Sequence, residues 1–274
     1  MDQLFQALVL GVVQGLTEFL PISSSGHLIV VPYLLGWNDP FITSLGFTVA
    51  LHAGTLLALL LYFREDWFRL VPAGLAALRD RSLRHDPDRR LAWLLVVSTI
   101  PAGILGVLLN DPIENAIRQA NVVAVLLVAA AGILWLADRW GSGRLAIDRL
   151  SMPTALGIGF AQALALFPGV SRSGISIAAG LFAGLDRSDA ARYSFLMATP
   201  VTAGAVLYEG LKLLKGGELS TEAGPLVVGI LAALVAGIIA ISALLRFVRT
   251  RSYNIFVAYR LVLAAVVLAV FLTR

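Results

Sequence analysis

The chain has 274 residues, of which 58% are hydrophobic and 14% are charged, and 21 basic against 17 acidic residues give a net charge of +4. A mean hydropathy of +0.85 excludes a soluble domain and indicates an all-α integral membrane protein. The absence of cysteine excludes disulfides and thiolate chemistry. The aqueous stretches are too short to fold alone, so we expect a single membrane domain over residues 1–274.

In chain order, an apolar region at 3–37 comes first and is interrupted in its middle, where Pro21 ends its first half. Three uninterrupted spans follow at about 41–63, 91–110 and 120–138. A second interrupted region covers 153–187, where Pro168 and Gly169 end the first half. Three more spans follow at about 189–211, 225–245 and 253–272. These six spans are long enough to cross a hydrocarbon core, which takes about 20 residues.

Each half of an interrupted region is too short to cross the membrane. A helix of that length covers about 20 Å, against about 30 Å for the core. The sequence therefore predicts two re-entrant helical hairpins, 3–37 and 153–187. Broken backbone at membrane depth is tolerated only where protein or a water-filled cavity covers it.

Arginines gather in three loops between apolar segments, 64–90, 139–152 and 246–252. This is the signal of cytoplasmic loops and explains the positive charge without nucleic-acid binding. It places both termini outside. Because three spans separate the hairpins, the halves have opposite orientations, as in an inverted-topology repeat with its site near the midplane. The repeats cover about 1–138 and 153–274.

A polar cassette occurs in both hairpins. The two copies share identical residues at equivalent positions, including Gln14/Gln162, Ser23/Ser171, Ser25/Ser173 and Gly26/Gly174. Polar groups at membrane depth are costly and mark functional sites. The duplication therefore predicts one site built from two halves.

The cassettes are suited to an anion such as phosphate. Serine clusters at Ser23, Ser24 and Ser25 and at Ser171 and Ser173 open each second half-helix, where free N–H groups and a partial positive charge favour anions. Gly26 and Gly174 let a ligand approach the backbone. Arg172 adds a charge and a planar donor fork. Its alternative role is a structural cap or an ion pair with Glu18.

Glu18 lies four residues after Gln14, on the same helix face. A carboxylate and an amide oxygen are ligands that Mg²⁺ and Ca²⁺ accept. The sequence thus predicts a divalent cation bound by Glu18 and Gln14. The alternative is a Glu18 held by Arg172 without a metal.

His27, three residues after Ser24, is a candidate to activate a nucleophile or to protonate a leaving group. Ser24 is either the nucleophile or a phosphate ligand. Other polar residues are interpreted as structural: His52 as a helix–helix hydrogen bond, His85 as solvated in a loop, and Arg260 as paired with Glu209 or directed to an interface. The charged segment 79–90 is interpreted as a solvated surface.

The two cassettes, QGLTEFLPISSSGH from Gln14 to His27 and PGVSRSGIS from Pro168 to Ser176, resemble both signature motifs of the bacterial undecaprenyl-diphosphate phosphatases of the bacitracin-resistance type. The resemblance covers essentially the whole chain. It implies hydrolysis of undecaprenyl diphosphate to undecaprenyl phosphate and inorganic phosphate in the bacterial inner membrane. This reaction recycles the lipid carrier for peptidoglycan and needs Mg²⁺ or Ca²⁺.

The resemblance also implies roles for single residues. It assigns Gln14 and Glu18 to the family's acidic motif, Ser24 and His27 to its Ser-x-x-His pair, and Arg172 to its key arginine. Ser176 stands where many members carry threonine, and we expect it to help bind phosphate. Gln14 departs from the glutamate of some members, which weakens its expected metal role.

The resemblance and the cassettes leave one rival function, a transporter or flippase of polyprenyl phosphate, because inverted repeats with broken helices are typical of transporters. A transporter needs no Ser-x-x-His pair. The expected site opens outward, the expected partners are the polyprenyl lipid and membrane lipids, and small residues from Gly229 to Gly237 permit helix contacts, including those of a homodimer.

Overall fold

The computed structural model describes residues 2–82, 86–117, 119–141, 143–216 and 223–273, and this part of the chain is helical almost throughout. Its helices are α1 (Gln3–Phe19), α2 (Ser24–Leu35), α3 (Leu45–Tyr62), α4 (Arg64–Asp80), α5 (Pro87–Ile117), α6 (Ala120–Trp140), η1 (Ile147–Arg149), α7 (Met152–Ala163), η2 (Leu164–Leu166), α8 (Arg172–Phe182), α9 (Arg187–Gly216), α10 (Ala223–Phe247) and α11 (Asn254–Thr273). The prediction of an all-α chain is confirmed.

Five helices of the described ranges are long and apolar enough to cross a membrane: α3, α5, α6, α10 and α11. They cover five of the six expected spans. The sixth, 189–211, lies within α9, whose apolar sequence is interrupted by polar residues such as Arg192, Ser194, Thr199 and Thr202. Hydropathy alone therefore does not mark α9 as a span.

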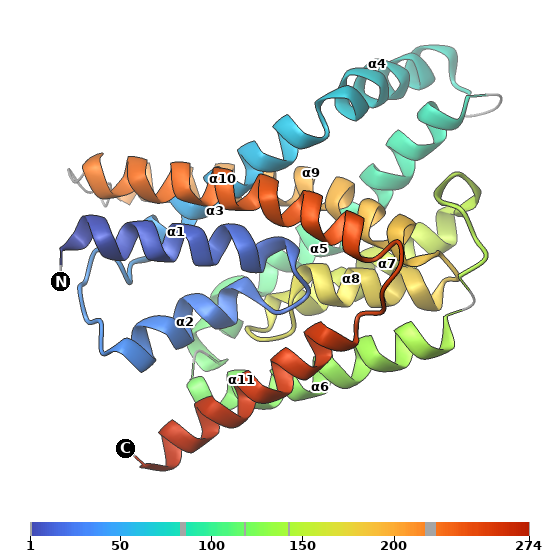
Figure 1. The fold of residues 1–274 in the computed structure, drawn as a ribbon. Helices are drawn as coiled ribbons and strands as arrows, with labels where there is room; N and C mark the ends of the chain where they lie inside the picture. Colours follow the sequence, from blue (N-terminus) through green and yellow to red (C-terminus); the bar gives the residue numbers. More distant parts are fainter. Residues whose placement is uncertain (1, 83–85, 118, 142, 217–222, 274) are drawn as a thin grey trace.

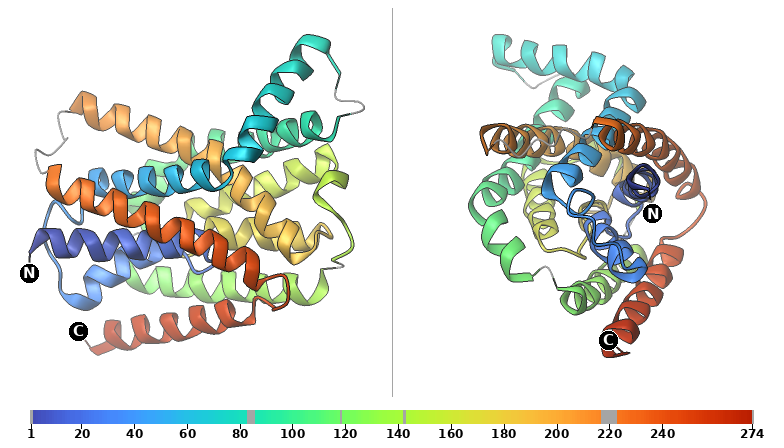
Figure 2. Two further views of the ribbon diagram at one scale, coloured as in Figure 1. Left: turned by 45° about the horizontal axis from the view of Figure 1, so that its top comes forward. Right: turned by 90° about the vertical axis from the view of Figure 1, so that its left-hand side faces the viewer.

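The two interrupted regions form two helix pairs. In Figure 1, α1 runs from the N-terminal end to the middle of the molecule, and α2 returns toward the same end. The second pair is α7 with η2, and α8. Both termini lie at one end, whereas α4 and the C-terminal ends of α6 and α10, which carry arginines, lie at the other (Figures 1 and 2). The broken helices meet inside the bundle and are surrounded by longer helices.

Glycine and alanine allow the helices around the first pair to approach closely. A Cβ on Gly11 or Gly15 of α1 would lie 2.5 Å from a carbonyl oxygen of α10, so α10 packs directly against α1. Gly229 and Gly237 of α10 contact side chains of α1 and α3. The small residues expected to permit helix contacts thus make those contacts within one chain.

Helix α7 of the second pair packs equally closely against α5. This packing can be tested at Gly159. A Cβ there would lie 2.3 Å from the backbone oxygen of Ser98, whereas a Cβ on Gly157 of the same helix meets nothing within 4 Å. We expect Gly159→Ala to destabilise the protein by about 1–3 kcal/mol through overpacking. Thermal unfolding in detergent measures this. The matched variant Gly157→Ala should be neutral or stabilising, and equal behaviour of the two would contradict the packing.

Residues 64–90 differ from the expected loop because most of them are helical. Acidic Glu65 and Asp66 in the first turn of α4 and Arg79 in the last complement the helix dipole. Asp66 also accepts hydrogen bonds from Arg69 at 2.8 Å and from Arg192 of α9 at 2.6 Å. The Arg69–Asp66 pair lies within α4, and the Arg192–Asp66 pair binds α4 to α9. Both stabilise a helix that hydropathy does not predict.

The solvated surface expected at 79–90 is only partly correct. Arg90 donates to the backbone oxygens of Asp148, at 2.7 Å, and Leu150, at 2.5 Å, and so ties the start of α5 to the turn before α7. His85 lies outside the described residues.

Candidate functional site

The site lies where the two broken helix pairs meet. The turn between α1 and α2 contains Pro21, and the turn before α8 contains Val170. Arg260 of α11, fully buried, donates to the backbone oxygen of Pro21 at 2.6 Å and to that of Val170 at 3.3 Å. One guanidinium therefore holds both turns together, which corrects the expectation that Arg260 pairs with Glu209 or reaches an interface.

Each turn ends in a serine with an unusual backbone. Ser23 has φ 76° and Ser171 has φ 73°, a region that residues other than glycine rarely adopt. In both, the side-chain oxygen accepts a hydrogen bond from the backbone N–H three residues on, at Gly26 or Gly174, and caps the following helix. The prediction that the second half-helices begin at the serine clusters is confirmed. Matching strain in both turns supports a duplicated site.

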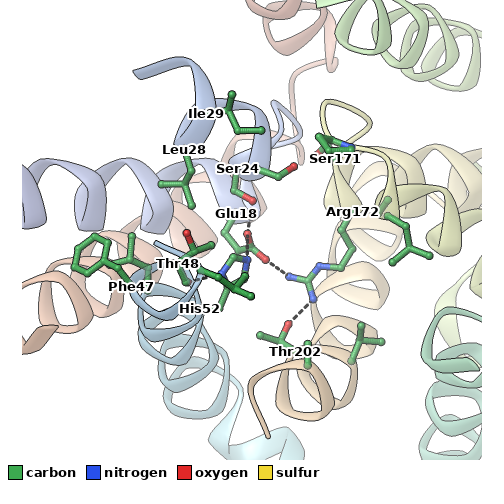
Figure 3. A pocket seen from close by; sticks show the side chains of 18 of the residues that line it. Glu18, Ser24, Leu28, Ile29, Phe47, Thr48, His52, Ser171, Arg172 and Thr202 are labelled. Carbon is green, nitrogen blue, oxygen red and sulfur yellow. Dashed lines mark hydrogen bonds and ion pairs between the residues drawn. The ribbon is translucent and has the colours of Figure 1, made fainter. Parts of the chain in front are cut away.

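A cavity of about 330 Å³ opens between the two turns. Its polar wall brings together Glu18, Ser24, Ser25, Thr43, Thr48, His52, Gln162, Ser171, Arg172 and Thr202. Figure 3 shows Glu18 between Ser24 and Arg172. The remaining wall of the cavity is apolar and includes Leu10, Leu28, Ile29, Ile42, Phe47, Leu51, Leu166, Val201 and Ala205. The cavity thus offers a charged end to a polar group and an apolar surface to a hydrocarbon chain.

Glu18 is the centre of the polar wall, and its side chain is only 6% exposed. Arg172 donates to its Oε1 at 2.5 Å, and Gln14 donates to its Oε2 at 3.0 Å. Ser24 also donates to Oε2, through a short hydrogen bond. The carboxylate is therefore shared between an arginine from the second pair and a serine hydroxyl from the first.

Arg172 and His52 complete this arrangement (Figure 3). Besides Glu18, Arg172 donates to the hydroxyl of Thr202 at 2.6 Å and to the backbone oxygen of Ala198 at 3.0 Å, so α9 fixes its orientation. The Nε2 of His52 lies 3.8 Å from Glu18 Oε2, while its Nδ1 forms a hydrogen bond with the backbone oxygen of Thr48. The cavity wall therefore presents four functional groups: the guanidinium of Arg172, the carboxylate of Glu18, the hydroxyl of Ser24 and the imidazole of His52.

This arrangement can be compared with known proteins. The family model described as bacitracin resistance protein BacA matches residues 7–266. The chain belongs to the BacA family. Curated relatives named undecaprenyl-diphosphatase come from Gemmatimonas aurantiaca, 44% identical over 270 residues, and Pelobacter propionicus, 46% identical over 271, each match covering 98% of both chains. Another, from Thermodesulfovibrio yellowstonii, is 40% identical over 274 residues and the full length of both chains.

The structure brings five of the predicted residues of this BacA family member to the cavity: Glu18, Ser24, Ser25, Ser171 and Arg172. It does not bring His27 there. The Nδ1 of His27 lies 2.7 Å from the backbone oxygen of Ser23, and its Nε2 lies 2.7 Å from the hydroxyl of Tyr259. Both ring nitrogens therefore bond to groups outside the cavity, and His27 links α2 to α11.

The other predicted phosphate ligands lie outside the cavity wall and form contacts within the protein. The hydroxyl of Ser173 donates to the oxygen of Leu20, and that of Ser176 lies 2.6 Å from the hydroxyl of Ser194. Gly174 has no free space beside it, because a Cβ there would lie 2.2 Å from Nη2 of Arg260. Five of the predicted phosphate-binding residues do not line the cavity: Ser23, Gly26, Ser173, Gly174 and Ser176.

Sequence analysis missed His52, Thr202 and Gln162 as cavity residues. His52 was interpreted as a helix–helix hydrogen bond, because it lies alone in an apolar span. Thr202 lies in α9, with no motif around it. Both come from elements distant in the sequence, so only their tertiary packing brings them to Glu18. Gln162 had a signal, its identity with Gln14 in the duplicated cassette.

The predicted metal ligands are a carboxylate on the cavity wall, Glu18, and a buried amide, Gln14, which does not itself line the cavity. Among the described residues no group of three or more His, Cys, Asp or Glu could hold a metal ion, and Glu18 is the only carboxylate of the described cavity wall. Beside it, Oε1 of Gln14 is buried without a hydrogen-bond partner. One carboxylate and an amide oxygen suit Mg²⁺ or Ca²⁺ only when phosphate or water oxygens complete the coordination.

Proposed function

We propose that this protein hydrolyses undecaprenyl diphosphate to undecaprenyl phosphate and inorganic phosphate, and so recycles the lipid carrier for peptidoglycan synthesis and confers bacitracin resistance. The observation that carries the proposal is the contact of Ser24 and Arg172 with the same Glu18 carboxylate, at two helix N-termini in a cavity with an apolar wall. The near full-length relatives named undecaprenyl-diphosphatase support it.

The diphosphate binds at the polar end of the cavity. Arg172 and the hydroxyls of Ser24, Ser25 and Ser171 donate to its oxygens, and the N-termini of α2 and α8 add their partial positive charge. The prenyl chain lies along the apolar wall and continues among the membrane lipids. These fixed donors also stabilise the charge that develops on the phosphate oxygens in the transition state.

The attacking group is Ser24 or a water molecule held beside it. Its oxygen forms a bond to the terminal phosphorus while the bond from phosphorus to the bridging oxygen breaks, and undecaprenyl phosphate leaves. The proton passes to Glu18, which already accepts the hydrogen bond of Ser24. With Ser24 as nucleophile, water then releases phosphate from the serine. His27 acts by holding α2 in place.

A divalent cation would be held by Glu18, with Gln14 beside it, together with phosphate oxygens. When bound, it neutralises charge on the diphosphate. Arg172 and the serines then orient the phosphate group for attack.

The proposed topology has six membrane spans, with α9 as the sixth, and two re-entrant hairpins, α1–α2 and α7–α8, in an inverted repeat. The arginines of α4 and of the ends of α6 and α10 support a cytoplasmic position for that end. The cavity wall includes Ile42 and Thr43 in the turn before α3 and Leu45 at its start, near the opposite end. We therefore place the active site toward the outer face of the inner membrane.

The proposed function is tested by phosphate release from undecaprenyl diphosphate, with the purified protein in detergent. We expect release with Mg²⁺ or Ca²⁺ and its loss on addition of a chelator, with recovery when the cation is restored. Phosphate release that is unaffected by the chelator would contradict the proposed requirement for a divalent cation. No release from folded protein that binds the lipid would favour the transporter.

A further inference from the structure

Gln162 of α7 is a buried amide that the proposed mechanism does not use. Its side chain is 2% exposed and lines the cavity. Neither its Oε1 nor its Nε2 has a hydrogen-bond partner in the described part of the chain. A buried polar group without a partner costs about 1–3 kcal/mol, so an amide in this state needs an explanation.

The duplicated cassette explains why Gln162 has no partner among the described residues. Its equivalent in the first copy, Gln14, donates to Glu18 four residues later, one helical turn away. Four residues after Gln162 the chain has Leu166, which cannot accept a hydrogen bond. The second copy therefore keeps the amide and lacks the carboxylate that would hold it.

The surroundings of Gln162 indicate what the amide binds. It shares the cavity wall with Ser171 and Arg172, which belong to the same helix pair. The described residues of this half contribute no carboxylate to the wall, because Glu18 comes from the first pair. A neutral amide beside an arginine and a serine hydroxyl offers N–H donors, which phosphate oxygens accept.

We infer that Gln162 is a substrate-binding residue whose Nε2 donates to a phosphate oxygen of the diphosphate. The inference rests on the proposed function, in which the diphosphate occupies this cavity. The two glutamines of the duplicated cassette have then diverged: Gln14 positions Glu18, and Gln162 binds the substrate. The described residues offer this amide no partner, so a hydrogen bond to the substrate breaks none within them.

The test replaces the amide by an apolar side chain of similar size, Gln162→Leu. We expect kcat/KM for undecaprenyl diphosphate to fall by about 10- to 100-fold, the value of a lost hydrogen bond to a charged group. The Tm of the free protein should stay the same or rise, because an unsatisfied buried amide has been removed. Gln162→Glu should lose more activity, because it adds a negative charge beside the phosphates and Glu18.

Gln6→Leu is the matched control. Gln6 of α1 is also a buried glutamine whose Oε1 has no partner, but it does not line the cavity. Its kcat/KM should match that of the wild type. A wild-type kcat/KM in Gln162→Leu, or a Tm that falls in that variant, would overturn the inference, since the amide would then be dispensable or structural.

Binding of inorganic diphosphate separates this inference from the proposed function. We expect inorganic diphosphate to raise the Tm of the wild type and of Gln6→Leu, and to raise that of Gln162→Leu less. If the wild type releases no phosphate from the lipid, the proposed function fails, but this comparison still tests Gln162. An equal shift in all three proteins would overturn the inference even where the wild type is an active phosphatase.

Discussion

Arg172→Ala is expected to lower phosphate release by at least about 100- to 1000-fold, the usual effect of removing a fixed group that stabilises transition-state charge. Arg172 is also the hydrogen-bonded cation beside Glu18, so its loss leaves a buried carboxylate without its counter-charge. Breaking a buried pair from one side destabilises a protein by about 3–5 kcal/mol. Phosphate release and thermal unfolding, measured on the same preparation, report the two effects.

A second variant separates them. In the double variant Glu18→Gln/Arg172→Ala no charge of this pair remains buried, so its Tm should lie above that of Arg172→Ala alone, while its activity stays lost. Arg172→Lys keeps the charge without the planar fork and should have intermediate activity. Arg64→Ala, at an exposed position of α4, is the control, and its phosphate release and Tm should match those of the wild type. Near-normal turnover in Glu18→Gln or Arg172→Ala would defeat the assignment of the site.

Arg260→Met is expected to have the second largest effect, although Arg260 does not line the cavity. The substitution leaves the buried backbone oxygens of Pro21 and Val170 without their donor, at a cost of about 1–3 kcal/mol each. Both turns that carry the serine caps then lose their common support. We expect a lower Tm and a large fall in kcat with a smaller change in KM, because Arg260 positions the catalytic groups without touching substrate.

Two further variants test this positioning role. Arg260→Lys keeps one donor and should restore part of kcat. Gly174→Ala keeps the arginine in the sequence, but its methyl group overlaps Nη2 and displaces the guanidinium, so it should reproduce the loss in Arg260→Met. Arg251→Met, at an exposed position between α10 and α11, is the control and should behave as the wild type. Normal Tm and normal kcat in Arg260→Met would show that the turns hold without it.

The local features of the site could be predicted because each depends on neighbours in the sequence. Pro21, Pro168 and Gly169 mark the breaks, the serines mark the starts of α2 and α8, and Gln14 lies one turn before Glu18. The alternative role of Arg172, an ion pair with Glu18, also follows from placing two halves of one site together, and the structure contains that pair.

Other features of the site depend on packing between distant elements, which the sequence pattern does not specify. His27 has the right spacing from Ser24, yet rotation of α2 turns its ring toward Tyr259 of α11. His52 was treated as isolated, although α3 brings it to Glu18. Arg260 is the only charged residue of its apolar span, and its partners are carbonyl groups that no sequence pattern reveals. Helix α4 owes part of its stability to Arg192 of α9.

The sequence by itself determined the class of protein, the positions of the apolar helices, the duplicated cassette and the family resemblance, since hydropathy, helix breaks and motifs are local properties of the chain. Only the tertiary structure decided which polar side chains share the cavity. That choice depends on the rotation and close approach of helices far apart in the chain, which buried glycines such as Gly15 and Gly174 permit and which Arg260 fixes through hydrogen bonds to both turns.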